Sequence, residues 1–182
     1  MATNFSYYFF KNVLNKKQIN SLNNTKLWER NLKDVGAQNV VKTSNVFLSK
    51  WKNLKEYLKD PYLLFLNEYH YHWNFNIFSL NDKRIIIKND YIDTSKGQYD
   101  WHNDGNHNTS SDIKFTIIIN ISKNYYEGGK FYIMRSGEEH VKELDTPGNM
   151  IFFPSYLPHK VSQVTKGTRS TLTIFIMGPA LC

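Results

Sequence analysis

Two histidines and one aspartate have the residue types and the spacing of a metal site. His102 and Asp104 are separated by one residue, in the segment Tyr-Asp-Trp-His-Asn-Asp that spans residues 99–104. On a β-strand, side chains two residues apart point to the same face, so both could reach one metal ion. His159 follows later, just after an apolar run. Two imidazoles and one carboxylate form the facial triad that binds non-haem Fe(II) and leaves positions open for other ligands.

The four other histidines have plainer explanations. His70 and His72 lie in an expected helix, and His107 and His140 in expected loops. Histidines in such places are more often packing or surface residues than ligands, so we do not include them in the site.

Arg169 has the character of a carboxylate-binding residue. It begins a strand-like run, residues 169–177, and its face of that strand also carries Thr171, Thr173 and Phe175. A buried guanidinium needs a partner, and a carboxylate can accept two parallel hydrogen bonds from it, to which Thr171 could add a third. The opposite face is aliphatic, so the alternative is a surface strand with an exposed arginine.

The first half of the chain is expected to be helical. Asn15 is placed to cap a helix over residues 15–22, and residues 48–58 have apolar side chains at helical spacing. Asp60 and Pro61 then have the types of an N-cap and a first helical residue. The helix that they would begin is expected to bury four side chains, those of Leu63, Leu66, His70 and Trp73.

The second half is expected to form strands. Runs rich in β-branched and aromatic residues cover 84–88, 98–102, 114–121, 130–134, 149–153, 160–164 and 169–177, with Gly-Gly, Pro-Gly and Lys-Gly turns among them. Many short strands predict a sandwich or jelly roll, and helices that precede strands predict an α+β fold with the helices on one face. We expect one domain over residues 1–182, with mostly helical support in 1–83 and a core that carries the site in 84–179.

Composition gives expectations about the partners, disulfides and location of the protein. The formal charge is +7, which favours acidic partners, although the lysines are scattered rather than clustered. Cys182 is the only cysteine, so no intramolecular disulfide can form. We expect no signal peptide, no membrane segment and a cytoplasmic or intracellular location. The abundance of Asn, Lys and Ile suggests an AT-rich source, such as a bacterium or a phage.

Five segments together resemble the prolyl 4-hydroxylase-type branch of the 2-oxoglutarate/Fe(II) oxygenases, especially the bacterial PKHD-type hydroxylases. They are residues 91–104, the Tyr-Glu-Gly-Gly-Lys-Phe segment 126–131, the Pro-Gly-Asn-Met-Ile-Phe-Phe-Pro segment 147–154, His159, and residues 166–171. They occur in the family's order and at similar spacing. The resemblance implies a double-stranded β-helix, or jelly roll, with iron at its open mouth.

The resemblance also implies cofactors and residue roles. Fe(II) would be bound by His102, Asp104 and His159, 2-oxoglutarate and O₂ would be cosubstrates, and ascorbate is a further candidate. Residues that would hold 2-oxoglutarate are Arg169, Thr171, Tyr91 and Asn120, although animal members of this branch often carry Tyr at the position of Asn120. The substrate side would be bordered by Tyr99, Trp101 and Phe175. The polar loop 105–112 is expected to be a lid over a peptide groove.

The expected reaction is hydroxylation of a prolyl residue in a peptide or protein, with succinate and CO₂ as co-products. The basic charge allows a second reading, a nucleic-acid oxidative demethylase, which would need a pocket for a flipped base. A third reading is a metal-binding jelly roll without catalysis, in which Arg169 has no role. The sequence does not define the oligomeric state.

Overall fold

The strands form two facing sheets and one short pair. The computed structural model describes residues 6–31, 40–105 and 111–180. The larger sheet has the order β1-β11-β7-β14-β5-β4-β2, and the smaller has the order β10-β9-β12-β6-β3. In the larger sheet the bounds are Tyr8–Phe10 (β1), Met150–Pro154 (β11), Ser111–Asn120 (β7), Thr168–Pro179 (β14), Ile85–Ile92 (β5), Asn45–Lys50 (β4) and Glu29–Asn31 (β2).

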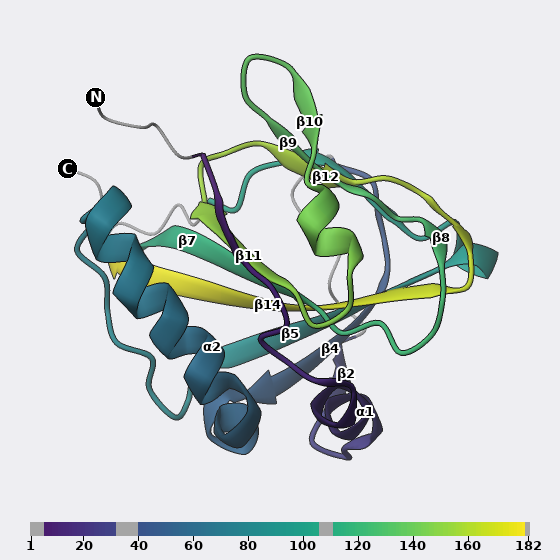
Figure 1. Ribbon diagram of the computed structural model, residues 1–182, viewed down its shortest axis with the longest axis horizontal. Coiled ribbons are helices and arrows are strands. Elements are labelled where there is room, and N and C mark those ends of the chain that lie inside the picture. The colour runs from purple at the N-terminus through teal and green to yellow at the C-terminus, as the bar shows by residue number, and fades with distance from the viewer. Residues whose placement is uncertain (1–5, 32–39, 106–110, 181–182) are drawn as a thin grey trace.

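The smaller sheet faces the larger sheet, and β13 and β8 form a separate pair. Their bounds are Glu138–His140 (β10), Phe131–Met134 (β9), His159–Val161 (β12), Gln98–His102 (β6), Lys42–Thr43 (β3), Val164–Lys166 (β13) and Glu127–Gly128 (β8). Every pairing of strands is antiparallel among the described residues. Figure 1 shows the helices on one side of the larger sheet and β9, β10 and β12 on the other.

Both faces of the larger sheet are buried, which explains its composition. Side chains of alternate residues in β7 and β14 enter two different apolar clusters. Ile117, Ile119 and Leu172 pack toward the helices, whereas Ile118 packs with Phe131 of the smaller sheet. The smaller sheet therefore buries the face of β14 that carries Arg169, and the alternative of a surface strand is wrong.

Helix α1 (Lys16–Asn24) begins as its sequence predicts. The Asn15 side chain accepts a hydrogen bond from the Gln18 amide, and the Gln18 side chain accepts one from the Asn15 amide, which makes a capping box. The helix buries Ile19 and Leu22 against the larger sheet. The expected helix 15–22 is confirmed and extends two residues further.

Helix α2 (Trp51–His72) corrects the prediction of two shorter helices. It passes through Pro61, which lies inside the helix rather than at its start. A proline in a helix interior costs about 3 kcal/mol, yet one continuous apolar stripe lies on both sides of it. The stripe consists of Trp51, Leu54, Leu58, Pro61, Phe65 and Tyr69. Burial of these side chains offsets the lost hydrogen bond, so the helix continues.

The buried face of α2 also differs from the expected one. Leu63 is 44% exposed and His70 is exposed, whereas Phe65 and Tyr69 are buried. Leu66 and Trp73 are partly buried. The prediction failed because it started the helical count at Pro61 rather than at Trp51.

No helix in the described part of the chain is long and apolar enough to cross a membrane.

The α+β jelly roll with helices on one face is confirmed, and most expected strands are present. Residues 98–102 form β6 with the expected bounds. The expected strand 160–164 is divided into β12 and β13. The short edge strands β1, β2, β3, β8 and β10 were missed, as was β4, part of which had been assigned to the helix beginning at residue 48. Two 3₁₀ turns, Asp93–Ser95 and Lys142–Asp145, complete the fold.

Candidate metal and cosubstrate site

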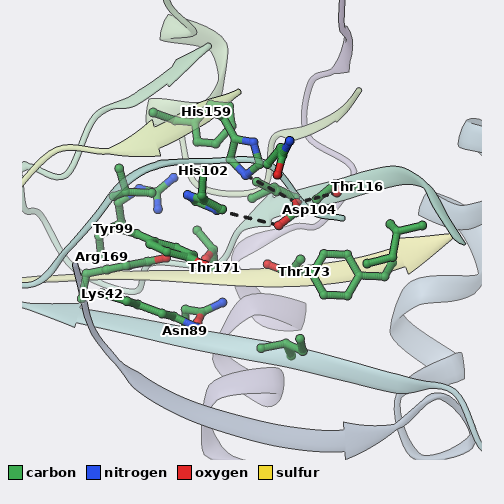
Figure 2. Close-up of a pocket in the computed structure, with 18 of the residues that line it drawn as sticks. Lys42, Asn89, Tyr99, His102, Asp104, Thr116, His159, Arg169, Thr171 and Thr173 are labelled. Atoms are coloured by element: carbon green, nitrogen blue, oxygen red, sulfur yellow. Dashed lines mark hydrogen bonds and ion pairs between the residues drawn. The ribbon is translucent and has the colours of Figure 1, made fainter. Parts of the chain in front are cut away.

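His102, Asp104 and His159 meet between the two sheets. Each offers one ligand atom, and these atoms lie within 4.8 Å of one another. His159 Nε2 is 3.4 Å from Asp104 Oδ2, and His102 Nε2 is 3.7 Å from Asp104 Oδ1. Figure 2 shows the three side chains converging on one point. Strand β12 pairs with β6 so that His159 lies opposite His102. This pairing brings His159 next to His102 and Asp104, although it is far from them in the sequence.

Backbone carbonyls orient both imidazoles. The Nδ1 of His102 is 2.7 Å from the Asp100 carbonyl, and the Nδ1 of His159 is 2.9 Å from the Leu157 carbonyl. Because a carbonyl only accepts, the proton of each neutral ring is on Nδ1 and the lone pair is on Nε2. This arrangement fixes the orientation of histidine ligands in metal sites.

Burial keeps the two histidines neutral. It lowers the pKa of His102 to about 4, with a further contribution from the neighbouring His159, and it lowers the pKa of His159 to about 4. Burial also raises the pKa of Asp104, against the effects of His102 and of a hydrogen bond from Thr116. Neutral imidazoles are the form that binds a metal, and a cation here would favour the charged form of the aspartate.

These pKa values predict that acid destabilises the metal-free protein. A histidine whose pKa falls from 6.5 to about 4 on folding takes up its proton only on unfolding, so stability is lost as the pH falls through this window. Between pH 7 and pH 5 the loss is about 2 kcal/mol for each histidine. The raised pKa of Asp104 acts in the opposite direction and offsets part of it.

Urea unfolding of the metal-free protein at pH 7 and pH 5 measures this loss. The double variant His102→Gln/His159→Gln removes both titrating rings and should show a flatter dependence on pH. Equal stability of the wild type at the two pH values would contradict the burial of neutral histidines.

Asp104 lies just beyond β6 and is held by other elements. Its amide donates to the Ser155 carbonyl at 2.9 Å, and its Oδ2 accepts a hydrogen bond of 2.6 Å from the Thr116 hydroxyl. The expectation that both ligands of the pair lie on one strand is therefore only partly right, because β6 ends at His102. These two contacts hold the carboxylate beside the histidines.

Arg169 lies in the same space and is 1% exposed. Its Nε and Nη2 atoms have no hydrogen-bond partner among the described residues, and its guanidinium carbon is 5.7 Å from the centre of the Tyr91 ring. Buried donors of a cation that lack a hydrogen bond are costly, so these two donors indicate that an anion belongs beside them. A carboxylate would accept both hydrogen bonds.

The Gly-Gly turn of residues 128–129 makes room for this arginine. Gly129 has a φ of +56°, and a Cβ on it would lie 2.9 Å from Arg169 Cδ and 2.7 Å from a Val164 methyl. A larger residue would thus collide with the stem of the arginine and would strain the backbone. Gly129 therefore makes room for Arg169 in the cavity and does more than form a turn.

The triad and Arg169 line one cavity of about 260 Å³. Five other side chains that the sequence placed in or near the site also line it: Tyr91, Tyr99, Thr171, Thr173 and Phe175. The Tyr99 ring stacks on the His102 ring, with a distance of 3.4 Å between centres. Figure 2 shows Thr171 between Arg169 and the metal-ligand group. The cavity thus joins a metal-ligand set to an anion-binding end.

Two residues that the sequence placed at the site, Asn120 and Trp101, do not line this cavity. Asn120 is buried outside its lining, and its amide donates to Tyr126 Oη and to the carbonyls of Leu144 and Asp145. Its oxygen accepts from the Ser122 amide, so the whole side chain is occupied in holding loops.

Trp101 also lies outside the lining. The Nζ of Lys160 lies 4.7 Å from the centre of its ring. Most of the expected lid, residues 106–110, lies outside the described residues.

Four polar residues of the cavity were missed from the sequence: Lys42, Asn89, Asn103 and Thr116. Thr116 was detectable, because it alternates with Ile118 on an expected strand. Asn89 falls just past the expected strand 84–88, which β5 extends to Ile92. Lys42 comes from a strand of two residues that gives no sequence signal.

Comparison with known proteins agrees with this geometry. Residues 88–177 match the model of the 2OG-Fe(II) oxygenase superfamily. The chain belongs to that superfamily. Its members are defined by Fe(II) and 2-oxoglutarate, and the segment that matches contains the triad and Arg169. The resemblance predicted from the sequence is confirmed.

Relatives of this superfamily member share sequence over short segments and share the fold over the whole chain. A PKHD-type hydroxylase of Gloeothece citriformis is 39% identical over 59 residues, which are 32% of this chain and 26% of the relative. The match thus spans about a quarter of that relative's length.

Two solved structures share the fold. The viral collagen prolyl hydroxylase of Paramecium Bursaria Chlorella virus-1 is 14% identical, with a TM-score of 0.67 and coverage of 98% of this chain and 99% of that one. A prolyl hydroxylase of Trichoplax adhaerens, in complex with a hypoxia inducible factor peptide fragment, is 14% identical, with a TM-score of 0.67 and coverage of 97% and 84%. At this identity the likeness establishes the fold alone.

The residues of this oxygenase fit the groups that its superfamily uses. Two neutral imidazoles and one carboxylate are a facial triad for Fe(II). The orphaned donors of Arg169 suit the carboxylate of 2-oxoglutarate that lies away from the metal.

Proposed function

We propose that this protein is an Fe(II)- and 2-oxoglutarate-dependent dioxygenase that hydroxylates a prolyl residue in a peptide or protein. One observation carries the proposal: a possible facial triad shares a cavity with a fully buried arginine whose Nε and Nη2 donors have no partner in the described part of the chain. A metal-binding protein without catalysis would have no use for that arginine.

The triad would hold the metal in a fixed geometry. His102 and His159 would bind Fe(II) through Nε2, since Nδ1 is committed to a backbone carbonyl in both. Asp104 would bind through Oδ1, because Oδ2 already accepts a hydrogen bond from Thr116. The bound Fe(II) would supply the activation of O₂ that couples decarboxylation of 2-oxoglutarate, to succinate and CO₂, with hydroxylation.

The other end of the cavity would orient 2-oxoglutarate. Arg169 would donate two hydrogen bonds to its far carboxylate, and Thr171 lines the cavity nearby and would add a third. Tyr91 packs beside the guanidinium, where its ring limits the positions that the carboxylate can take. Binding at both ends fixes the cosubstrate relative to the metal, which is the main contribution of a protein to this kind of chemistry.

A proline-containing substrate fits the remaining walls. Tyr99 and Phe175 line the cavity beside the metal ligands, and a proline ring packs well on aromatic faces. The relatives named above as prolyl hydroxylases, one of them bound to a peptide, also support a peptide or protein substrate.

A comparison of candidate substrates tests which class of molecule is oxidised. The iron-loaded protein is offered proline-rich peptides and methylated oligonucleotides in separate reactions, and succinate is measured above the uncoupled background. We expect peptides to stimulate succinate formation and to gain one oxygen atom at proline, as measured by mass spectrometry. Stimulation by oligonucleotides alone would replace this proposal with nucleic-acid demethylation. Absence of any succinate with every substrate would favour a metal-binding protein without catalysis.

A further inference from the structure

Asn89 presents an unpaired hydrogen-bond acceptor in the wall of the cavity. It lies in β5, opposite Thr171 of β14 (Figure 2), and is 6% exposed. Its Oδ1 is buried and has no hydrogen-bond partner among the described residues. A buried amide oxygen without a partner is costly, so a hydrogen-bond donor belongs beside it.

The asparagine on the other side of Thr171 differs from Asn89 in this respect. Asn120 lies opposite Thr171 on β7, so the threonine has an asparagine on each neighbouring strand. The Asn120 oxygen accepts a hydrogen bond from the Ser122 amide, and its amide group donates to nearby loops. The oxygen of Asn89 has no such role in holding the fold, and Asn89 lines the cavity. A ligand in the cavity is therefore the natural source of its donor.

Asn89 lies beside the expected path of the cosubstrate rather than on it. Thr116, which donates to Asp104, lies opposite Phe175, so the metal ligands lie toward β7. The order of neighbouring strands is β7-β14-β5. A molecule that joins Arg169 of β14 to the metal ligands would extend toward β7, whereas Asn89 is on β5, on the opposite side. This part of the wall is left for a second ligand.

The cosubstrate does not supply the missing donor, if the proposed function holds. The carboxylates and the keto group of 2-oxoglutarate only accept hydrogen bonds at neutral pH. The donor must then come from the primary substrate. A prolyl residue has no backbone N–H, so the nearest backbone donor that follows an internal proline is the N–H of the next residue.

We propose that Asn89 is a specificity residue whose Oδ1 accepts a hydrogen bond from the peptide N–H that directly follows the oxidised proline. This inference rests on the proposed function and narrows its substrate class to an internal proline followed by a residue other than proline. A C-terminal proline, or the first residue of a Pro-Pro pair, lacks that N–H. A site built to bind a substrate N–H rejects analogues without it, because its own buried group then loses its partner.

Peptides in which one amide is replaced by an ester test the proposal by binding rather than by turnover. The parent probe is acetyl-Gly-Ala-Pro-Ala-Gly-Ala-amide. In the test ester, lactic acid replaces the alanine after proline, which exchanges the N–H for an oxygen and keeps the length of the chain. In the control ester, glycolic acid replaces the glycine that follows, so the N–H after proline is kept.

Calorimetry with the protein loaded with Fe(II) and 2-oxoglutarate, without O₂, gives the affinity for each probe. We expect the parent peptide to bind about tenfold more tightly than the test ester, as the loss of one buried hydrogen bond predicts. The control ester should bind nearly as tightly as the parent, because its N–H after proline is intact.

Variants of Asn89 then assign the preference. Asn89→Leu keeps the approximate size of the side chain and removes the acceptor, so the parent and the test ester should bind it equally. Asn89→Ala removes the acceptor without added bulk and should give the same result if the leucine variant does not fold. Asn45→Leu is the matched control, because Asn45 lies in the neighbouring strand β4, accepts a hydrogen bond from Arg30 and is outside the cavity lining. It should keep the preference for the parent.

Three outcomes would overturn the inference. The first is a wild type that binds the parent and the test ester equally, and the second is a preference that survives in the Asn89 variants. The third is an affinity for 2-oxoglutarate, rather than for the peptide, that falls in these variants, which would assign Asn89 to the cosubstrate. Failure of the proposed function has a different signature, because no proline peptide would then bind to the loaded wild type or stimulate its succinate release.

Discussion

Asp104→Ala should abolish succinate formation and should weaken metal binding by more than about 100-fold, since even partners outside the ligand set contribute 10- to 100-fold. The reason is that Asp104 supplies the only carboxylate among the described residues that line the cavity. Metal content after equilibrium dialysis and succinate release with 2-oxoglutarate measure the two effects. The loss should not reflect unfolding, because the variant removes a buried carboxylate whose pKa is raised by burial.

Thr116→Val provides a graded control for this variant. It keeps the ligand and removes only the hydroxyl that donates to Asp104 Oδ2 at 2.6 Å. We expect a loss of metal affinity of about 10- to 100-fold, smaller than that of Asp104→Ala. Full metal content and full turnover in Asp104→Ala would refute the assignment of the triad.

Arg169→Ala should raise the concentration of 2-oxoglutarate needed for half-maximal turnover by about 100-fold, which corresponds to the loss of two charge-assisted hydrogen bonds. Arg169→Lys should restore only part of the affinity, because an ammonium group cannot form the planar pair of hydrogen bonds. Arg135→Ala is a suitable control, since Arg135 is exposed and pairs with Glu139 away from the cavity. Titration of 2-oxoglutarate against succinate release measures the effect.

A different pattern would reassign Arg169 to the substrate. If the demand for 2-oxoglutarate stays the same while the affinity for the primary peptide falls, the arginine faces the substrate instead. Its burial and its unpartnered donors would then need a substrate anion as their explanation.

Local sequence patterns predicted the strands well and the long helix poorly. Residues 98–102 alternate and are bounded by turn residues, so β6 was found with its observed bounds. In α2, the sequence signal of Asp60-Pro61 is a real local preference for a helix start. It was overridden because burial of Phe65 and Tyr69, in line with Leu58, depends on the sheet beneath the helix. Tertiary packing of that kind is not visible in a local pattern.

Much of the site was predictable, because its chemistry depends on a few rare residue types. The spacing of His102 and Asp104 and the position of Arg169 in an alternating strand placed these residues in one cavity with His159. Asn120 lies on the expected strand but outside the cavity lining, because its amide group donates to Tyr126 Oη and to the Leu144 carbonyl. Lys42 could not have been found, since only the pairing of β3 with β6 brings it to Tyr99.

The dependence of 2-oxoglutarate binding on the metal tests the account most directly. Calorimetric titration of 2-oxoglutarate into the protein without O₂ is compared with and without Fe(II), in the wild type, Asp104→Ala and Arg169→Ala. We predict one binding site per chain in the metal-loaded wild type, with affinity greatly reduced by removal of the metal or by either substitution. Binding of equal affinity with and without metal, or unchanged by loss of Arg169, would contradict a single site shared by the triad and the arginine.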